Sequence, residues 1–476
     1  MKKNFLFNLL LSFSNILFPI ISFPYVARIL GPEGIGKVQF IFSYAQYFSV
    51  FAALGIPVYG IKEIAKYKGN PDKISSVFLS LSTIFFLTSL FAAILYFSSV
   101  ILLPFFKDQQ PMYLLAGAMV FLSFTYSDWY YAGKEDFKII AIRSLVVKAI
   151  ALILLYTWVK TAQDLYPYLA VLIFTIIGNQ VYGFALVFVK DKQSFSSLAL
   201  RTHIKPLLFI FGATAASSIY TVWDTILLGF LSNATAVGFY TASIKIVKLL
   251  LPFVTSVGAV AIPSLAHKFA NNKLEEVKIT IHDSFYFLVF LTIPMAIGIY
   301  ILAPELIIIF SGKAFSASVI PMQILSLLPL LVGFGYLFAF QILIPAEKNK
   351  EVFIAMLAGL IISAAFNLIL VPHFSEVGAA CATIATEIGV TIIYYYYTRK
   401  YFQFDYPWKF FGQSLIAALL FIPVVLSIRA LLDNIYLMAT LSIIACTLLY
   451  GLVHLLVFKN IFLLKYLRRK KAIVND

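Results

Sequence analysis

Long apolar stretches alternate with short polar turns along most of this chain. Runs of about 20 apolar residues, the length needed to cross the hydrocarbon core of a bilayer, recur fourteen times. The predicted spans are 5–27, 38–61, 75–103, 112–132, 139–159, 166–189, 206–230, 236–260, 283–303, 319–344, 352–371, 376–398, 411–430 and 435–458. The pattern predicts an all-α integral membrane protein with about 14 transmembrane helices.

The composition supports this class and excludes several others. Hydrophobic residues make up 62% of the 476 residues and charged residues only 12%, against about 25% charged residues in a soluble domain. Cys381 and Cys446 both fall inside apolar runs, which argues against a disulfide framework or a cysteine metal site. The histidines show no HExxH spacing and no phosphate-binding GxxxxGK[ST] loop occurs, so we expect no metal and no cofactor.

The loop charges predict the orientation of the chain in the membrane. Most of the 36 Lys and Arg residues fall in the N-terminus, the tail and every second loop, and the positive-inside rule places those segments in the cytoplasm. The opposite loops hold few cations, namely Arg28, Lys37, Lys107, Lys160, Lys313 and Arg429. Both termini are therefore predicted to be cytoplasmic. The net charge of +15 follows from this topology and does not indicate a nucleic-acid partner.

Four cations remain inside the predicted spans: Arg143, Lys148, Lys245 and Lys248. A charge at the bilayer centre costs about 2.5–3.5 kcal/mol on insertion scales, so such a residue normally faces water or a partner. Lys245 lies roughly 14 Å into its span at 1.5 Å per residue. Lys248 shares its face, because residues three apart on a helix are neighbours. We interpret these cations as candidates for binding an anionic cargo.

Three carboxylates also lie within or beside the spans. Asp224 lies close in predicted depth to Lys245, Glu387 is in mid-span, and Asp128 is predicted to reach Arg143 near the inner surface. Such pairs can simply hold helices together. Asp224 and Glu387 are alternatively candidates for binding a coupling ion, H⁺ or Na⁺. Polar span residues that could contact sugars, or only satisfy helix backbones, are Asn15, Gln46, Asn179, Gln180, Gln341 and Asn367.

Similar turns recur in two halves of the chain. The segments 28-RILGPEGIGKVQF-40 and 226-ILLGFLSNATAVGFY-240 each give a span end, a Leu-Gly pair, a polar turn, a second Gly and a new apolar helix. Internal repetition of this kind is common in secondary transporters. We predict a six-helix lobe at 1–190, a second six-helix lobe at 191–398, and an appended helix pair with a basic cytoplasmic tail at 399–476.

The segments 25-YVARILGPEGIGKVQF-40, 128-DWYYAGKEDFKIIAIR-143 and 224-DTILLGFLSNATAVGFYTASIKIV-247 together resemble the Wzx-type polysaccharide-repeat flippases of the multidrug/oligosaccharidyl-lipid/polysaccharide exporter superfamily. The resemblance implies two six-helix bundles around a cationic cavity and an extra pair of helices. It also implies transfer of an undecaprenyl-pyrophosphate-linked oligosaccharide, an O-antigen or capsule unit, across the bacterial inner membrane. Membrane lipids and other polysaccharide assembly proteins are the implied partners. The arginine in the family's first turn falls on Arg28.

Two other functions remain open and a third is disfavoured. A multidrug/cation antiporter of the same superfamily would favour carboxylates in its cavity, whereas this chain places more lysines than carboxylates in mid-span. A lipid II flippase would use the same mechanism and is poorly separated by sequence. A membrane-embedded glycosyltransferase would need a large outer loop, and the predicted outer loops are short; we therefore expect no enzyme.

Overall fold

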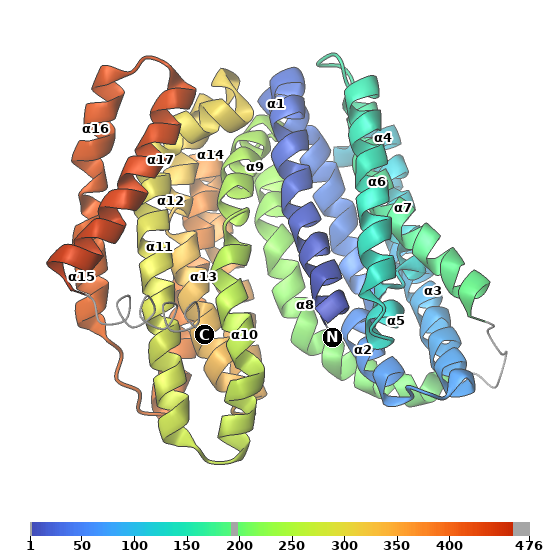
Figure 1. Ribbon diagram of the computed structural model, residues 1–476. Helices are drawn as coiled ribbons and strands as arrows, with labels where there is room; N and C mark the ends of the chain where they lie inside the picture. Colours follow the sequence, from blue (N-terminus) through green and yellow to red (C-terminus); the bar gives the residue numbers. More distant parts are fainter. Residues whose placement is uncertain (1, 192–198, 460–476) are drawn as a thin grey trace. The chain divides into compact units, whose positions relative to one another are not determined.

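The computed structural model describes residues 2–191 and 199–459, and within these ranges the secondary structure is helical without strands (Figure 1). The predicted all-helical class is thus confirmed. The predicted basic tail lies outside the described residues from position 460 onward. The chain divides into two compact units, Met1–Gly238 and Phe239–Asp476, which are treated separately below. The predicted division at residues 190 and 398 stays a prediction.

The first unit is an antiparallel helical bundle built around the long helix α1. Its helices are α1 (Lys2–Ala53), α2 (Ile56–Lys66), α3 (Pro71–Leu102), α4 (Gln110–Phe121), α5 (Asp128–Gly133), α6 (Phe137–Trp158), α7 (Leu165–Lys190) and α8 (Leu200–Leu231). Short 3₁₀ turns, η1 (Pro104–Gln109) and η2 (Leu122–Thr125), precede and follow α4. Helix α1 packs against α3, α4, α6 and α8. Helix α9 (Ala234–Lys248) begins in this unit and ends in the second.

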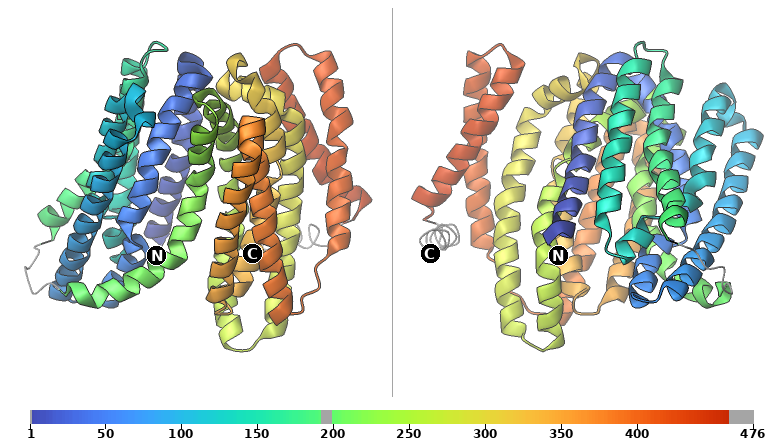
Figure 2. Two further views of the ribbon diagram at one scale, coloured as in Figure 1. Left: turned by 180° about the vertical axis from the view of Figure 1, so that it is seen from behind. Right: turned by 45° about the vertical axis from the view of Figure 1, so that its right-hand side comes forward.

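The second unit surrounds helix α11. Its elements are α10 (Leu251–Ala270), α11 (Leu274–Ser311), η3 (Lys313–Ser318), α12 (Val319–Leu325), α13 (Leu328–Tyr336), the π-helix η4 (Leu337–Leu343), α14 (Asn349–Tyr401), α15 (Trp408–Leu419), α16 (Phe421–Leu431), α17 (Ile435–Leu452) and the π-helix η5 (Val453–Val457). Helices α15, α16 and α17 all pack against α11, and the red pair α16–α17 runs beside the yellow α11 in Figure 2. Helix α11 is therefore the main packing partner of these C-terminal helices.

Ten helices of the described chain are long and apolar enough to cross a membrane, which agrees with a multi-pass membrane protein. Two of them are too long for one crossing. Helices α1 and α14 have 52 and 53 residues, about 80 Å at 1.5 Å per residue, against a hydrocarbon core of about 30 Å. The predicted number of fourteen spans stays a prediction.

Both long helices contain a break where the backbone leaves helical geometry. In α1 the break is at Gly31 (φ 65°), inside the turn predicted from its Leu-Gly pair. In α14 it is at Ser375 (φ 47°), a conformation that costs energy for a residue other than glycine. The two halves of α14 then run antiparallel, because Gly359 faces Val390 while Gly378 lies against Leu370 near the break.

The two similar Leu-Gly turns meet within the first unit. A Cβ atom at Gly36 would overlap the carbonyl group of Ala234, and one at Gly238 would overlap the carbonyl group of Pro32. The contact is reciprocal, because each turn offers a glycine to the backbone of the other. Small residues allow helix backbones in membranes to approach this closely, so these glycines cannot be enlarged without separating the turns.

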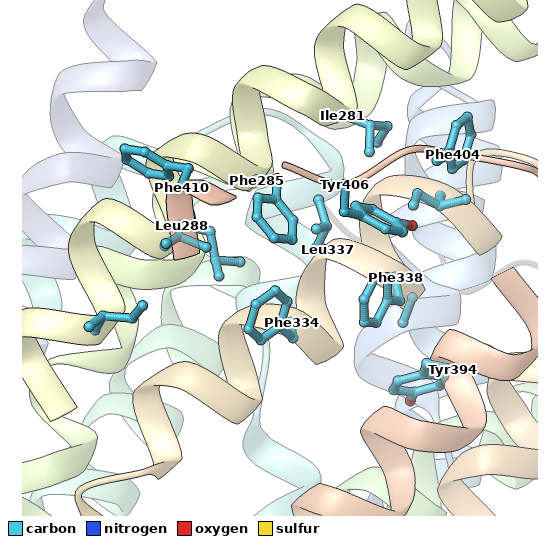
Figure 3. Packing of buried hydrophobic residues seen from close by; sticks show 14 of the residues in the cluster. Ile281, Phe285, Leu288, Phe334, Leu337, Phe338, Tyr394, Phe404, Tyr406 and Phe410 are labelled. Atoms are coloured by element: carbon cyan, nitrogen blue, oxygen red, sulfur yellow. The ribbon is translucent and has the colours of Figure 1, made fainter. Parts of the chain in front are cut away.

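Each unit has its own apolar core rich in aromatic rings. In the first unit Trp129, Phe78 and Tyr96 are almost fully buried, and Gly60 leaves room for the Trp129 ring between α2 and α5. In the second unit the side chains of α11, α13, η4 and the 402–407 connection interlock, as Phe285, Phe334 and Tyr406 do in Figure 3. These cores are the frame that holds the polar groups described next.

Candidate functional site

The predicted approach of Asp128 to Arg143 is confirmed. Asp128 opens α5 and Arg143 lies in α6, and the guanidinium Nη2 donates to the Asp128 carboxylate. The Arg143 side chain is only 3% exposed, against 28% for Asp128. The guanidinium also lies over the Tyr131 ring, and a Cβ atom at Gly183 of α7 would overlap it. This enclosure favours a structural role for Arg143, whereas its predicted role as a cavity cation stays a prediction.

Lys148 faces a different helix from Arg143. Five residues turn an α-helix by roughly 140° beyond a full turn, so Lys148 is directed toward α1 while Arg143 faces α5 and α7. Its ammonium group donates to Ser14 Oγ at 3.0 Å and to Asn15 Oδ1. The side chain is half-buried. Lys148 is thus a partly accessible cation held in place by two polar groups of α1.

A cavity of about 460 Å³ lies inside the first unit, and Tyr126, two residues before Asp128, is part of its lining. Its polar lining comes from Gln46 and Ser49 of α1, Tyr126 before α5, and Gln180 of α7. The apolar lining comprises Val50, Ala53, Gly55, Pro57, Val58, Met119, Ile176 and Phe211. The oxygen Oε1 of Gln180 is buried without a hydrogen-bond partner in the described part of the chain. Among the described lining residues none carries a carboxylate or a cation.

Lys245 and Lys248 lie in the last turns of α9, within the second unit. Lys245 is half-buried and Lys248 is exposed. The opposite side of α9 is packed into the unit, because Tyr240 bonds Thr383 at 2.9 Å and Ser243 bonds the Ser318 carbonyl at 2.7 Å. Relative to Tyr240, Lys245 is rotated by roughly 140° about the helix axis. Lys245 and Lys248 are thus the more exposed residues of these last turns, since Ile244, Ile246 and Val247 around them are buried.

Asp224, the predicted partner of Lys245, lies in the first unit, and Glu387, a predicted site for a coupling ion, lies in the second unit. Asp224 is buried in α8 of the first unit, so its pairing with Lys245 stays a prediction. Glu387 is buried in α14 of the second unit, within a seam of buried polar residues on the two antiparallel halves. The seam consists of Ser363, Asn367, Thr383, Thr386 and Glu387. Carboxylate, hydroxyl and amide oxygens inside a membrane are groups that bind protons or small cations.

Arg28 is the arginine that the family resemblance places in the first turn, and it lies three residues before the break at Gly31. Its guanidinium donates to the Pro24 carbonyl at 2.7 Å, one turn back on α1, and the side chain is exposed. No group of three or more His, Cys, Asp or Glu residues that could hold a metal occurs in the described part of the chain.

One buried ion pair is absent from the sequence predictions. Glu305 of α11, 8% exposed, binds Arg429 of α16 at 2.8 Å. The sequence does indicate a similar depth for the two residues, since both lie at predicted outer ends of spans. It was missed because the two residues are 124 positions apart and neither shows a pattern that joins the helices.

Comparisons with known proteins found a matching family model and relatives similar in sequence. The model of the polysaccharide biosynthesis protein family matches residues 1–269. A protein named "Putative O-antigen transporter" from Escherichia coli (strain K12) is 25% identical over 421 residues, covering 84% of this chain and 97% of that protein. A protein of the same name from Shigella dysenteriae is 24% identical over 402 residues, covering 82% of this chain and 98% of that protein.

Solved structures show the same fold at low identity. The lipid II flippase MurJ in an inward closed conformation has a TM-score of 0.74 at 16% identity, covering 96% of this chain and 99% of that chain. An inward-facing multidrug resistance MATE family transporter of the MOP superfamily has a TM-score of 0.64 at 13% identity, covering 82% and 93% of the two chains. Since the family model spans more than half of the chain, this protein belongs to the polysaccharide biosynthesis protein family.

Proposed function

We propose that this protein is a flippase that moves an undecaprenyl-pyrophosphate-linked oligosaccharide from the inner to the outer leaflet of the bacterial cytoplasmic membrane. Both chain termini lie in the cytoplasm, and transport proceeds by alternating access. Family membership, the two relatives named as O-antigen transporters and the fold shared with a lipid II flippase support this proposal. The cargo is an O-antigen, capsule or similar repeat unit.

The choice of cargo is supported by the residues that line the cavity of the first unit. The described lining of the first unit's cavity is uncharged and mainly apolar, and its polar groups are two amides, a serine and a tyrosine. Amide and hydroxyl groups both donate and accept hydrogen bonds, as the hydroxyl groups of a sugar do. A cationic drug or a coupling cation would instead be stabilised by a carboxylate. The lining therefore favours a neutral, hydroxyl-rich group over the cargo of a cation antiporter.

Deletion of the gene in the bacterium that carries it separates the candidate functions. A polysaccharide flippase predicts loss of the surface polysaccharide, and undecaprenyl-linked oligosaccharide accumulates on the inner leaflet. A lipid II flippase predicts accumulation of the cell-wall precursor instead. An antiporter predicts altered drug susceptibility with unchanged surface polysaccharide. Either of the last two results would refute the proposal.

The lysines of α9 are proposed to stabilise the pyrophosphate group. Ammonium groups bind phosphate as point charges and tolerate varied geometry better than a bidentate guanidinium. Complementing the deletion with Lys245→Ala plus Lys248→Ala should restore less than a tenth of the surface polysaccharide. Lys313→Ala is the matched control, because Lys313 is an exposed lysine of the same unit outside α9. Full restoration by the double variant would remove the lysines from the mechanism.

The buried seam around Glu387 is the proposed site for a coupling ion, H⁺ or Na⁺. Replacing Glu387 with Gln keeps the shape and removes the titratable charge. We expect uptake of labelled lipid-linked oligosaccharide by proteoliposomes to lose its dependence on an imposed ion gradient in Glu387→Gln, while cargo binding persists. Gradient-driven uptake at the wild-type rate would exclude Glu387 as the coupling site.

A further inference from the structure

A second pocket, of about 250 Å³, lies in the first unit at the ends of α3, α8 and α9. The loop charges assign these ends to the outer side of the membrane. The lining consists of Lys37, Phe40, Phe105, Asp108, Gln109, Tyr113, Gly229, Ser232, Asn233, Ala234 and Val237. All of these residues belong to the first unit, and none lines the larger cavity of that unit. We name it the outer pocket.

The 3₁₀ turn η1 sets an aromatic ring and a carboxylate side by side in the outer pocket. Phe105 and Asp108 are three residues apart in this turn, and side chains at that spacing are eclipsed in a 3₁₀ helix. Phe105 is 50% exposed, and Asp108 is also exposed. The turn therefore presents a ring face and an acceptor group in the same direction.

The Phe105 ring is held in place although it is half-exposed. Its centroid lies 4.8 Å from that of Phe230, 5.2 Å from that of Phe106 and 5.9 Å from that of Phe40. Phe106 and Phe40 are themselves buried. A ring fixed by its neighbours loses little conformational entropy when a ligand stacks on it.

The polar groups of the outer pocket are available and carry no excess positive charge. The side chains of Asp108 and Gln109 make no hydrogen bond or ion pair with any residue of ranges 2–191 and 199–459. Lys37 binds Glu33 at 2.5 Å, so its charge is already balanced. Asn233 Oδ1 accepts from the Ala236 amide at 2.9 Å, which fixes the start of α9 at the pocket wall. This arrangement favours a neutral hydroxyl-rich ligand and disfavours a phosphate.

We propose that the outer pocket binds one neutral sugar residue of the transported oligosaccharide on the outer side of the membrane. The proposal rests on the proposed transport function. The C–H face of the sugar ring stacks on Phe105, because the faces of aromatic rings carry negative charge density and attract polarised C–H groups. Ring hydroxyls donate to the Asp108 carboxylate and exchange hydrogen bonds with Gln109. The volume is below the range of about 300–1,000 Å³ for drug-sized ligands, which limits the pocket to a single ring.

Saturation-transfer difference NMR on the full-length protein in lipid nanodiscs tests this site. Nanodiscs avoid sugar-bearing detergents, and the probes are free glucose, galactose, rhamnose and N-acetylglucosamine. We expect saturation of the ring protons of at least one probe, with an apparent affinity about tenfold lower in Phe105→Ala and in Asp108→Asn. Phe91→Ala, an equally drastic change at a 64% exposed phenylalanine of α3 outside the pocket, should bind as the wild type does.

Several outcomes would overturn the proposal. They are absence of saturation with all four sugars, an equal loss in the Phe91→Ala control, or saturation of ethanolamine without saturation of any sugar, which would indicate a lipid headgroup. A protein that restores surface polysaccharide but fails this test refutes the outer pocket and leaves the transport function intact. Sugar binding that depends on Phe105, in a protein whose deletion leaves surface polysaccharide unchanged, refutes the transport function and leaves the pocket.

Discussion

The pair formed by Asp128 and Arg143 gives the sharpest test of how the first unit is held together. Asp128→Asn keeps the shape of the side chain and removes the charge opposite a guanidinium that is 3% exposed. Breaking a buried ion pair from one side costs about 3–5 kcal/mol. Because Asp128 is itself 28% exposed, water relieves part of this cost, and we expect the lower end, about 3 kcal/mol.

The complementary change should cost less. Arg143→Met removes the cation and keeps an apolar chain against Tyr131, while the remaining Asp128 carboxylate can be hydrated. The double variant Asp128→Asn/Arg143→Met contains no unpaired charge. It should therefore be more stable than Asp128→Asn alone, with a coupling free energy of at least about 1 kcal/mol.

Thermal unfolding followed by tryptophan fluorescence measures the effect, because Trp129 is buried in the same short helix as Asp128. At about 2–4 °C per kcal/mol for a unit of this size, Asp128→Asn should lower Tm by about 6–12 °C. Differences between variants suffice, since membrane proteins of several units seldom unfold in two states. If the two single effects add within about 0.5 kcal/mol, the pair is not coupled and the reasoning is refuted.

Three further predictions follow from individual contacts. Gly183→Ala should destabilise the protein by displacing the enclosed guanidinium, whereas Gly412→Ala, where a Cβ atom meets nothing within 4 Å, should be neutral or stabilising in the same melting assay. Arg429→Gln should lower Tm by about 2–4 °C, since Glu305 loses its partner but Arg429 is 38% exposed and the pair is partly hydrated. Burial lowers the pKa of His203, which bonds Tyr59 at 2.8 Å near the start of α8. Protonation below an unfolded pKa of about 6.5 therefore favours unfolding, so the fall in Tm between pH 7.5 and pH 5 should be smaller in His203→Gln.

The sequence predicted those features of the fold that depend on local pattern. The apolar runs gave the helical membrane class, and the Leu-Gly turn marked the break at Gly31. The Asp128–Arg143 pair was predictable because its members lie on successive helices joined by a short turn. Contacts between distant helices were not predictable, because apolar periodicity does not state which helices are neighbours. Lys148 is bound by Ser14 and Asn15 across more than 130 residues, and nothing local to Lys148 indicates this.

Within the proposed transport, the polar groups of the two units are suited to different parts of the cargo. In the first unit the cations Arg143 and Lys148 of α6 bind protein groups, and the described lining of the cavity is uncharged. To bind Arg143, a pyrophosphate would have to displace Asp128 from a buried guanidinium, which the ion pair opposes.

Within this proposal, the phosphate group interacts with the lysines of α9, and the cavity of the first unit contacts sugars. The two roles can be separated by competition between cargoes in proteoliposomes. Substitution of both α9 lysines should reduce transport of all undecaprenyl-pyrophosphate cargoes to a similar extent, whatever their sugars. Gln46→Leu and Gln180→Leu should instead change the ratio between cargoes that differ only in their sugars, because each removes hydrogen-bonding groups from the cavity wall. If the glutamine variants slow every cargo equally, the cavity does not distinguish between sugars, and the assignment of phosphate and sugar to separate sites is wrong.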